Sequence, residues 1–239
     1  MGELRVLVVA AHGDDEVLGA GGTIAWHVRR GDQVRLCIMS DSITTAPGLE
    51  IRRRETPSRL TPSAGNRRSA FEASAASLGV ESFVMYDFPD NAFDSVPLLN
   101  LIYVVEDEMA AFRPDRVYTH HVGDLSRDHS LTCQAVLTSV RPDVGSVPDV
   151  YSFEVRSSTD WSDPLMMAQA FRPNVWHGLD EDLVATKMLA LSSYKDEMRA
   201  WPHSRSFEAL DFLLRHRGAQ IGLPAAEAFM LLRRVRPLV

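Results

Sequence analysis

The stretch VLVVAAHGDDE, residues 6–16, decides the fold of this chain. Its apolar part, residues 6–11, is rich in valine and continuous rather than alternating, which is typical of a strand buried on both faces of a parallel sheet. One imidazole and three carboxylates follow directly, from His12 to Glu16. Open α/β sheets bind their ligands at the carboxyl ends of strands, so we expect His12 at such an end. The stretch therefore predicts an α/β protein with a site that starts at His12.

The rest of the chain alternates predicted helices and strands, as parallel βα units do. Residues 225–236 fit either a strand or a helix, and an irregular stretch is expected up to His177. Together the elements predict a Rossmann-like, mostly parallel sheet with helices on both faces, in a single domain over residues 1–239. The predicted helices are 17–30, 69–78, 98–112, 129–140, 180–193 and 207–217, and the predicted strands are 33–40, 82–88, 116–120 and 149–155.

Charge and composition argue against several classes of protein. The chain has 25 Lys and Arg against 32 Asp and Glu, a formal net charge of −7, which disfavours nucleic acid partners and stable association with an acidic membrane surface. No apolar run approaches ~18 residues and no N-terminal signal pattern is present, so we expect a cytoplasmic protein without a membrane span. Cys37 and Cys133 lack metal-type spacing and are expected as buried free thiols.

Two segments carry expectations about exposure. In the predicted helix 17–30, Trp26 is expected in the core and His27 on the surface. Residues 44–66 are rich in Pro, Gly, Ser, Thr and Arg, with three arginines at 52–54, and predict a long mobile loop or a short-helix excursion. Further arginines, including Arg68, extend this basic region. It is interpreted either as a solvated arginine face or as a lid that meets an anionic part of a substrate, such as a phosphate.

A second dense segment, HHVGDLSRDH, spans residues 120–129 at the end of the predicted fourth strand. Its last histidine, His129, is expected on the first turn of the following helix. Neighbouring strands would bring this segment beside His12, and two imidazoles with one carboxylate suit zinc with an open position for water. Of Asp14 and Asp15, one could bind metal while the other takes the water's proton. Helix capping alone would explain one acid, but neither His12 nor the second segment.

These motifs resemble those of a known family. AHGDDE, residues 11–16, is similar to the Ala-His-Pro-Asp-Asp-Glu motif of the N-acetylglucosaminyl-phosphatidylinositol de-N-acetylase family, also called PIG-L or LmbE-like, with Gly13 in place of proline. Asp128-His129 matches the second motif of that family. The stretches 88–91, 152–155 and 157–159 give weaker support, so that the resemblance covers roughly positions 5–160.

The resemblance implies a function and a set of site residues. It implies that His12, Asp15 and His129 bind Zn²⁺ and that Asp14 is the general base. The implied reaction is hydrolysis of an N-acetyl group on an amino sugar or sugar conjugate, which gives acetate and a free amine. The implied partner is a small N-acetyl sugar, free or linked to phosphate or a nucleotide. A homo-oligomer is left open.

One position departs from the family pattern. Many members have a second histidine three residues before the later ligand, where this chain has Ser126, a poor general acid. The proton for the leaving amine would then come from protonated Asp14, from His121, which lies at the same strand end and ranks first among the histidines, or from His203. Asp124 is expected to orient the imidazole that is used.

Substrate contacts and rival functions complete the expectations. Asp90 and Asn91, in a turn after the predicted third strand, are either turn formers or substrate contacts. Two rival functions are a sugar-binding module without turnover, suggested by Ser126 and Gly13, and a magnesium-dependent phosphoryl hydrolase. The two histidines favour zinc over magnesium, which prefers oxygen ligands.

Overall fold

The structure, a computed structural model, describes residues 2–40, 64–141, 147–162 and 170–236. Residues 44–63 of the predicted loop at 44–66 lie outside the described residues. They include the three arginines at 52–54. The last three residues of this predicted loop, 64–66, belong to a helix that starts five residues earlier than the predicted 69–78. All described strands join one sheet.

Seven strands form this sheet in the order β3-β2-β1-β4-β5-β7-β6. The first five of these strands are parallel, while β7 runs antiparallel to both β5 and β6. The α/β class and the mostly parallel sheet are therefore confirmed. The strands are β1 (Arg5–His12), β2 (Gln33–Ser40), β3 (Ser82–Met85), β4 (Arg116–His120), β5 (Asp149–Phe153), β6 (Val175–Gly178) and β7 (Ala226–Arg234).

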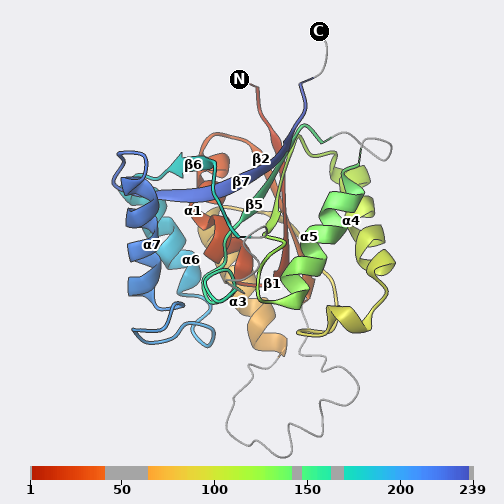
Figure 1. The fold of residues 1–239 in the computed structure, drawn as a ribbon, viewed down its shortest axis with the longest axis horizontal. Coiled ribbons are helices and arrows are strands. Elements are labelled where there is room, and N and C mark those ends of the chain that lie inside the picture. The colour runs from red at the N-terminus through yellow and green to blue at the C-terminus, as the bar shows by residue number, and fades with distance from the viewer. Residues whose placement is uncertain (1, 41–63, 142–146, 163–169, 237–239) are drawn as a thin grey trace, which may run out of the picture.

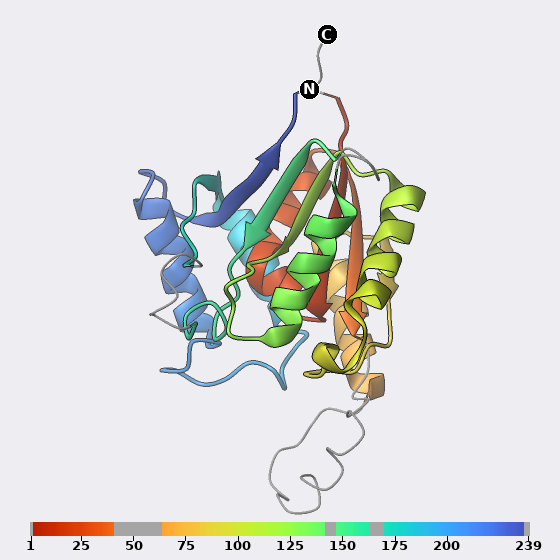
Figure 2. The ribbon, with the colours of Figure 1, turned by 45° about the vertical axis from the view of Figure 1, so that its right-hand side comes forward.

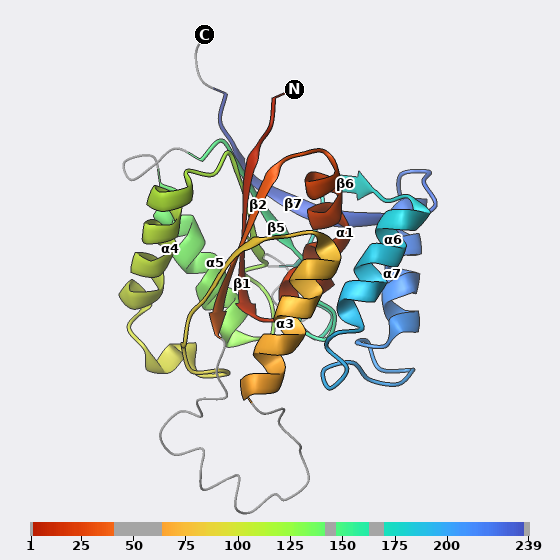
Figure 3. The same ribbon diagram turned by 180° about the vertical axis from the view of Figure 1, so that it is seen from behind.

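Helices cover both faces of the sheet, as the alternating pattern predicts (Figures 1 and 3). On one face lie α4 and α5, and on the other lie α1, α3, α6 and α7. Figure 2 shows α5 in front of the strands with α1 behind them. The helices are α1 (Asp15–Arg29), α3 (Ala64–Leu78), α4 (Leu98–Phe112), α5 (Arg127–Ser139), α6 (Glu181–Leu191) and α7 (Phe207–Ala219), with a short 3₁₀ turn, η1 (Phe93–Ser95).

The continuous apolar run of β1 supplies both cores. Alternate side chains of a strand point to opposite faces, so Val8 packs with the α1, α3 and α6 side and Val9 with the α4 and α5 side. Helix α1 packs closely on the sheet at Gly19, where an added Cβ would lie 2.2 Å from the Phe153 ring on β5. Cys37 is a buried free thiol, as predicted, and so is Cys133.

The C-terminal third differs from the expectation at His177, which was predicted at the end of an irregular stretch and lies within β6. Within residues 225–236, expected as either strand or helix, Ala226–Arg234 form the strand β7. A carboxylate near the start of β7, Glu227, is 3% exposed and pairs with Lys187 of α6 at 2.6 Å. A lone buried charge would be costly in an inner strand of the sheet, and this ion pair compensates the charge of the carboxylate.

The expected exposure of His27 is wrong. Its side chain is fully buried, with Nδ1 2.6 Å from Asp32 Oδ2 and Nε2 3.2 Å from the Tyr118 hydroxyl. Two polar partners therefore replace the water that a surface position would provide. Trp26 is partly buried and packs at the edge of the core.

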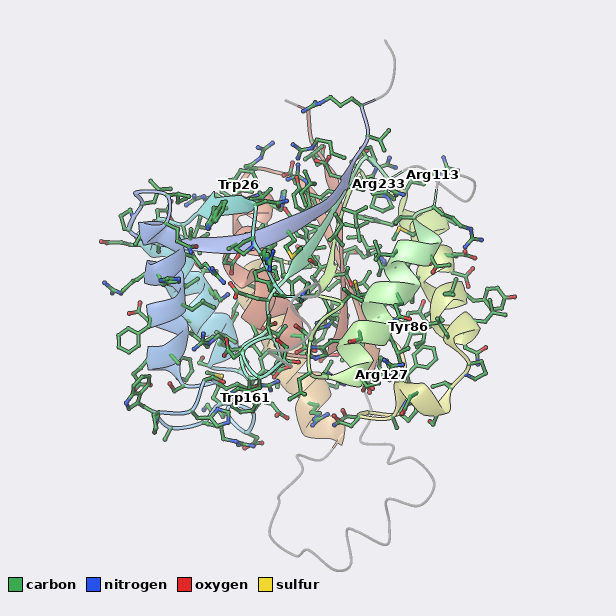
Figure 4. The ribbon with its side chains drawn as sticks, viewed as in Figure 1. Trp26, Tyr86, Arg113, Arg127, Trp161 and Arg233 are labelled. Atoms are coloured by element: carbon green, nitrogen blue, oxygen red, sulfur yellow. The ribbon has the colours of Figure 1, made fainter. Side chains whose placement is uncertain are left out.

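The fold places the carboxyl ends of β1 and β4 side by side, at the lower edge of the view in Figure 1. Figure 4 labels Arg127 and Trp161 at this edge and Arg113, which precedes β4, at the opposite edge. The chain order of the strands reverses between β1 and β4, which is the position where open α/β sheets form ligand crevices. Among the described helices, none is long and apolar enough to cross a lipid bilayer.

Candidate metal centre and active site

A cavity of about 280 Å³ opens beside the end of β1. Its wall combines the β1–α1 turn with loops that follow β3, β4, β5 and α6. Most lining side chains are polar or charged. They are His12, Gly13, Asp14, Arg67, Asp90, Asn91, Leu125, Ser126, His129, Ser157, Ser158, Trp161, Glu197 and Arg205.

The residues predicted to bind metal lie together: His12 and His129 line this cavity, and Asp15 is buried beside them. Asp15 Oδ2 is 3.1 Å from His12 Nδ1 and 3.2 Å from His129 Nε2. The ligand atoms of the three side chains all lie within 4.8 Å of one another. Burial raises the pKa of Asp15, but the neighbouring His129 and His120 lower it further, so that it stays well below its usual range. Asp15 is therefore an ionised carboxylate between two imidazoles.

Each imidazole is held from behind by a carboxylate. His129 Nδ1 is 2.9 Å from Asp124 Oδ2, and His12 Nε2 is 3.0 Å from Asp128 Oδ2. In both rings the other nitrogen faces the Asp15 carboxylate, where a cation could be shared among the three side chains. A carboxylate behind a metal-binding histidine fixes the tautomer and the orientation of the ring.

This donor set fits a metal ion better than the two alternative groups nearby. Asp15 Oδ1 is buried and has no hydrogen-bond partner among the described residues, which a cation beside the carboxylate would compensate. In the second group, His120 Nε2 already accepts from the Ala11 backbone at 2.8 Å. In the third group, Asp128 already accepts two backbone N–H groups, those of residues 91 and 93. The group at Asp15 is therefore the candidate metal centre.

Asp14 lies next to this centre in a strained backbone conformation. Its φ of 119° is in the region that favours glycine, and its carboxylate lines the cavity. Burial raises the pKa of Asp14 to about 7, against the lowering effect of Arg205, whose Nη1 donates to Asp14 Oδ2 at 2.9 Å. A carboxylate with a pKa near neutrality can both accept and return a proton.

A buried pair behind Asp14 holds the turn in place. Glu16 Oε2 accepts from the Asp14 backbone N–H at 3.0 Å, and Glu16 Oε1 accepts from the Tyr194 hydroxyl at 2.7 Å. Burial raises the pKa of Glu16 to about 8 despite these hydrogen bonds. Glu16 is not among the residues that line the cavity, so its contacts serve the backbone of the turn.

The two adjacent histidines at the end of β4 point to opposite sides. His121 is buried, stacks edge-on against Phe171, and does not line the cavity. His120 lies beside the centre instead, stacked on His129 with ring centroids 3.9 Å apart. Because neighbouring residues of a strand alternate in direction, only one of the pair can face the centre. The geometry thus gives no support to His121 as a proton donor to a bound substrate.

The remaining predicted residues divide between the cavity and its surroundings. Asp90 and Asn91 line the cavity, whereas Asp124 is buried behind His129 and also accepts from the Thr159 hydroxyl at 2.6 Å. His203 stacks edge-on against the lining residue Trp161 and its Nδ1 accepts from a backbone N–H. These positions make Asp124 a support for His129 and place His203 outside the cavity wall.

The predicted contact Arg68 does not line the cavity, and its neighbour Arg67 does. Arg68 is half-exposed and its Nε donates to Glu72 one turn later at 3.1 Å. The helix starts at Ala64 rather than 69, so Arg67 precedes buried Phe71 by one turn and shares its inward face. Extending the helical spacing backwards from Phe71 would have selected Arg67.

Two further lining residues come from the connection between α6 and α7. Arg205 pairs with Asp14, and Glu197 accepts from Arg67 Nη2 at 3.2 Å. Both lie more than 180 residues beyond the β1–α1 turn in a segment with no local motif. In the sequence, the only indication that Arg205 and Glu197 belong to the site was that they lie close to the candidate His203.

A comparison with protein families identifies the chain. Residues 7–140, more than half of its 239 residues, match the model described as PIG-L, GlcNAc-PI de-N-acetylase. The chain belongs to the PIG-L family. It is accordingly an N-deacetylase of a metal-dependent family, and the cluster at Asp15 is its candidate metal centre.

Individual relatives are similar over most of the chain. "Uncharacterized deacetylase YaiS" of Escherichia coli is 25% identical over 195 residues, which cover 80% of this chain and 90% of YaiS. The A40926 pseudoaglycone deacetylase Dbv21 has the same fold, with a TM-score of 0.73 and 21% identity over 99% of this chain and all of that structure. The N,N'-diacetylchitobiose deacetylase of Pyrococcus horikoshii matches with a TM-score of 0.68 and 22% identity over 95% of this chain and 83% of its own.

Proposed function

We propose that this member of the PIG-L family is a zinc-dependent hydrolase that removes the acetyl group from an N-acetylated amino sugar or sugar conjugate. The observation that carries the proposal is the position of Asp14. Its carboxylate shares one cavity with the His12 and His129 imidazoles, directly beside the candidate metal ligand Asp15. Relatives described as deacetylases of sugar-bearing compounds support the class of substrate.

The donor set suits zinc. Two imidazole nitrogens and one carboxylate from His12, His129 and Asp15 leave a coordination position for water, the arrangement of catalytic zinc sites. A zinc ion held there would polarise the amide carbonyl and lower the pKa of the attacking water. Magnesium prefers oxygen ligands and near-octahedral geometry. A donor set with two imidazoles therefore disfavours a magnesium-dependent phosphoryl hydrolase.

Asp14 would carry the proton through the whole reaction. As general base it takes a proton from water while the water oxygen bonds to the carbonyl carbon. It then returns that proton to the nitrogen as the C–N bond breaks, which yields acetate and the free amine. Among the described lining residues, the only imidazoles are those of His12 and His129, both assigned as ligands. The same carboxylate is therefore proposed as base and acid.

The rim of the cavity offers contacts for a sugar. Arg67 Nη1 donates to Asp90 Oδ2 at 2.7 Å, and this ion pair presents donors and acceptors to sugar hydroxyls. Asn91 lines the same wall, and Trp161, which is 51% exposed, provides an aromatic face. These side chains are proposed to orient the amino sugar so that its acetyl group reaches Asp14.

The proposal is tested by acetate release. The zinc-loaded protein is incubated with N-acetylglucosamine and a panel of its conjugates, and acetate and free amine are quantified together. We expect equal amounts of the two products, loss of both with chelator, and recovery on addition of zinc. A fully metal-loaded protein that releases acetate from no member of the panel would contradict the proposal.

One observation favours a second candidate, a sugar-binding module without turnover. Ser126 occupies the position where many family members have a histidine, and it caps α5 instead. A protein that binds amino sugars and zinc without releasing acetate would establish this alternative.

A further inference from the structure

The proposed general base lies beside the candidate metal centre but outside the range of its ligands. Asp14 directly precedes Asp15 in the chain, and both side chains are buried. Asp14 nevertheless belongs to none of the groups of three described residues whose ligand atoms lie within 4.8 Å of one another. A carboxylate so near a metal site is attracted to the cation. A contact that opposes this attraction is therefore expected.

The guanidinium of Arg205 makes such a contact. Its Nη1 donates to Asp14 Oδ2 at 2.9 Å, and among the described residues none makes a hydrogen bond with Oδ1. The two side chains are 21% and 6% exposed, so the ion pair is largely shielded from water. An ion pair that is shielded in this way is held more strongly than one at the surface. Arg205 thus retains one oxygen of the carboxylate and leaves the other without a partner.

Arg205 is itself fixed by the residues around it. Its Nε donates to Ser157 Oγ at 2.7 Å, and Ser157 lines the same cavity from the loop that follows β5. The backbone N–H of Arg205 donates to His203 Nδ1 at 3.0 Å. A guanidinium presents its N–H donors in a rigid planar fork. The contact with Ser157 therefore also sets the direction of the N–H group that Asp14 accepts.

Both turns that Arg205 joins are strained. The φ of Asp14 is 119° and that of Ser157 is 70°, in the region that favours glycine. Strained backbone persists only where the surrounding contacts over-determine it, and such residues cluster at active sites. Because Arg205 donates to both side chains, it ties the β1–α1 turn to the loop after β5.

The number of protein ligands decides what a zinc site can do. Catalytic zinc sites have three protein ligands and keep a fourth position for water, whereas protein ligands fill all four positions of structural sites. His12, Asp15 and His129 would supply three ligands here. If the Asp14 carboxylate joined them, the open position and the proposed base would be lost together.

We propose that Arg205 is a positioning residue that holds the Asp14 carboxylate away from the metal and so keeps one coordination position open. The inference deepens the proposed function and rests on it, since it takes Asp14 as the base. If Arg205 served only to anchor the connection before α7, its loss would change stability but would leave metal coordination as it is.

The first test measures zinc binding without substrate. Competition with a chelator gives the Kd of Zn²⁺ for the wild type, Arg205→Met, Asp14→Ala and the double variant. Loss of the guanidinium charge tightens zinc binding in both backgrounds, whereas capture of the carboxylate requires Asp14. We expect Arg205→Met to tighten zinc binding about tenfold more with Asp14 present than in the Asp14→Ala background, a coupling typical of side chains in contact. Equal ratios in the two backgrounds would overturn the proposal.

The second test is spectroscopic. The visible absorption of the Co²⁺-loaded protein depends on the number and type of ligands, so Arg205→Met should change it, and Asp14→Ala should abolish that change. Ser157→Ala loosens Arg205 without altering the net charge and gives a second probe if Arg205→Met does not fold. Arg199→Met is the matched control, because Arg199 is an exposed arginine of the same segment that does not line the cavity. A spectrum unchanged in both Arg205→Met and Ser157→Ala would refute the role of Arg205.

Turnover separates this inference from the proposed function. With a substrate that the wild type deacetylates, zinc-loaded Arg205→Met should lose about 10–100-fold in kcat, as is typical for residues that position metal ligands, and should leave KM unchanged. The zinc coupling without acetate release by the wild type supports the role of Arg205 and refutes the hydrolase. Acetate release by the wild type without the zinc coupling refutes the role of Arg205 and leaves the hydrolase intact.

Discussion

Two strand-turn-helix units meet at the candidate metal centre, and their helix N-termini differ. In the β1–α1 unit, Asp14 occupies the N-cap position, yet its side chain makes no capping hydrogen bond and its φ is 119°. In the β4–α5 unit, Ser126 at the N-cap has an ordinary extended conformation, and its hydroxyl accepts from the His129 backbone. One N-cap residue, the proposed general base, thus leaves its helix uncapped, while the other caps its helix.

If Asp14 is the general base, as proposed, capping and catalysis would compete for the same side chain. A capping oxygen accepts from the N–H groups of the first helical turn, whereas a general base must point at its substrate. Asp14 gives up the cap and is held by Arg205 and by Glu16 behind its backbone. Ser126 keeps the cap, at the position where many relatives have a histidine.

Of the variants that test this comparison, Asp14→Asn is expected to have the largest effect, a loss of turnover. The amide keeps the size of the side chain but cannot take a proton, so kcat should fall by about 10²–10⁴-fold. Bound zinc should remain near one ion per chain, because the proposed ligands are unchanged. Acetate release and metal content are measured on the same preparation. Retained turnover would remove Asp14 as the base, and lost zinc would make it a ligand.

His27, near the other end of α1, is expected to make the free energy of unfolding depend on pH. Burial lowers the pKa of His27 to about 4 despite its hydrogen bond to Asp32, whereas an unfolded histidine titrates near 6.5. Between these values the unfolded chain binds a proton that the folded chain does not, so stability falls as the pH is lowered through this window.

From pH 7 to pH 5 the contribution of His27 is about 2 kcal/mol. Urea unfolding of the wild type and of His27→Gln at both pH values measures it. The wild type should lose about 2 kcal/mol more than the variant, and parallel losses would contradict the assignment.

The strain at Asp14 is isolated by comparing Asp14→Gly with Asp14→Asn. Both variants lose the base, but only glycine accepts a φ of 119° without steric cost. A residue held in a sparsely populated backbone region costs about 1–3 kcal/mol. We therefore expect Asp14→Gly to unfold at higher urea concentration, by about 1 kcal/mol, although it is inactive. Equal midpoints would show that the turn is unstrained.

The smallest expected effect is at the other N-cap. Ser126→Ala removes a cap with a long hydrogen bond of 3.5 Å, so the free energy of unfolding should fall by about 0.5–1 kcal/mol. Ser206→Ala removes the tighter cap of α7, at 3.0 Å, and should cost more. Acetate release by Ser126→Ala should stay within twofold, since serine is a poor acid. A large loss of activity would instead give Ser126 a part in the chemistry.

Local patterns were sufficient for the elements nearest the centre. The bounds of β2, α4 and β4 agree with the predicted ranges, because each is a short apolar run or a regular helical repeat ended by a turn signal. The first strand and the helix after it were likewise evident from VLVVAAHGDDE. The antiparallel β6 and β7 were not, since pairing direction depends on long-range contacts. Glu227 is tolerated in β7 only through Lys187 and the N–H groups of α1.

The residues of the candidate site likewise fall into those that local patterns indicate and those that only long-range contacts bring to the site. His12, Asp14, Asp15 and His129 belong to motifs next to strand ends, so short-range reasoning could find them. Arg205 and Glu197 lie in an irregular connection far along the chain, where no helix or strand periodicity indicates which way a side chain points. At the end of β4 the sequence favoured His121 as a proton donor, whereas the tertiary structure places its neighbour His120 beside the centre.

By itself the sequence determined the α/β class, the strand end at His12 and the residue types for a metal and a base, because these follow from local apolar runs and from short motifs. The tertiary structure alone decided what surrounds them: the carboxylates behind His12 and His129, and the arginine on Asp14. These contacts join segments that are distant in sequence, and their geometry depends on how the helices pack across both faces of the sheet.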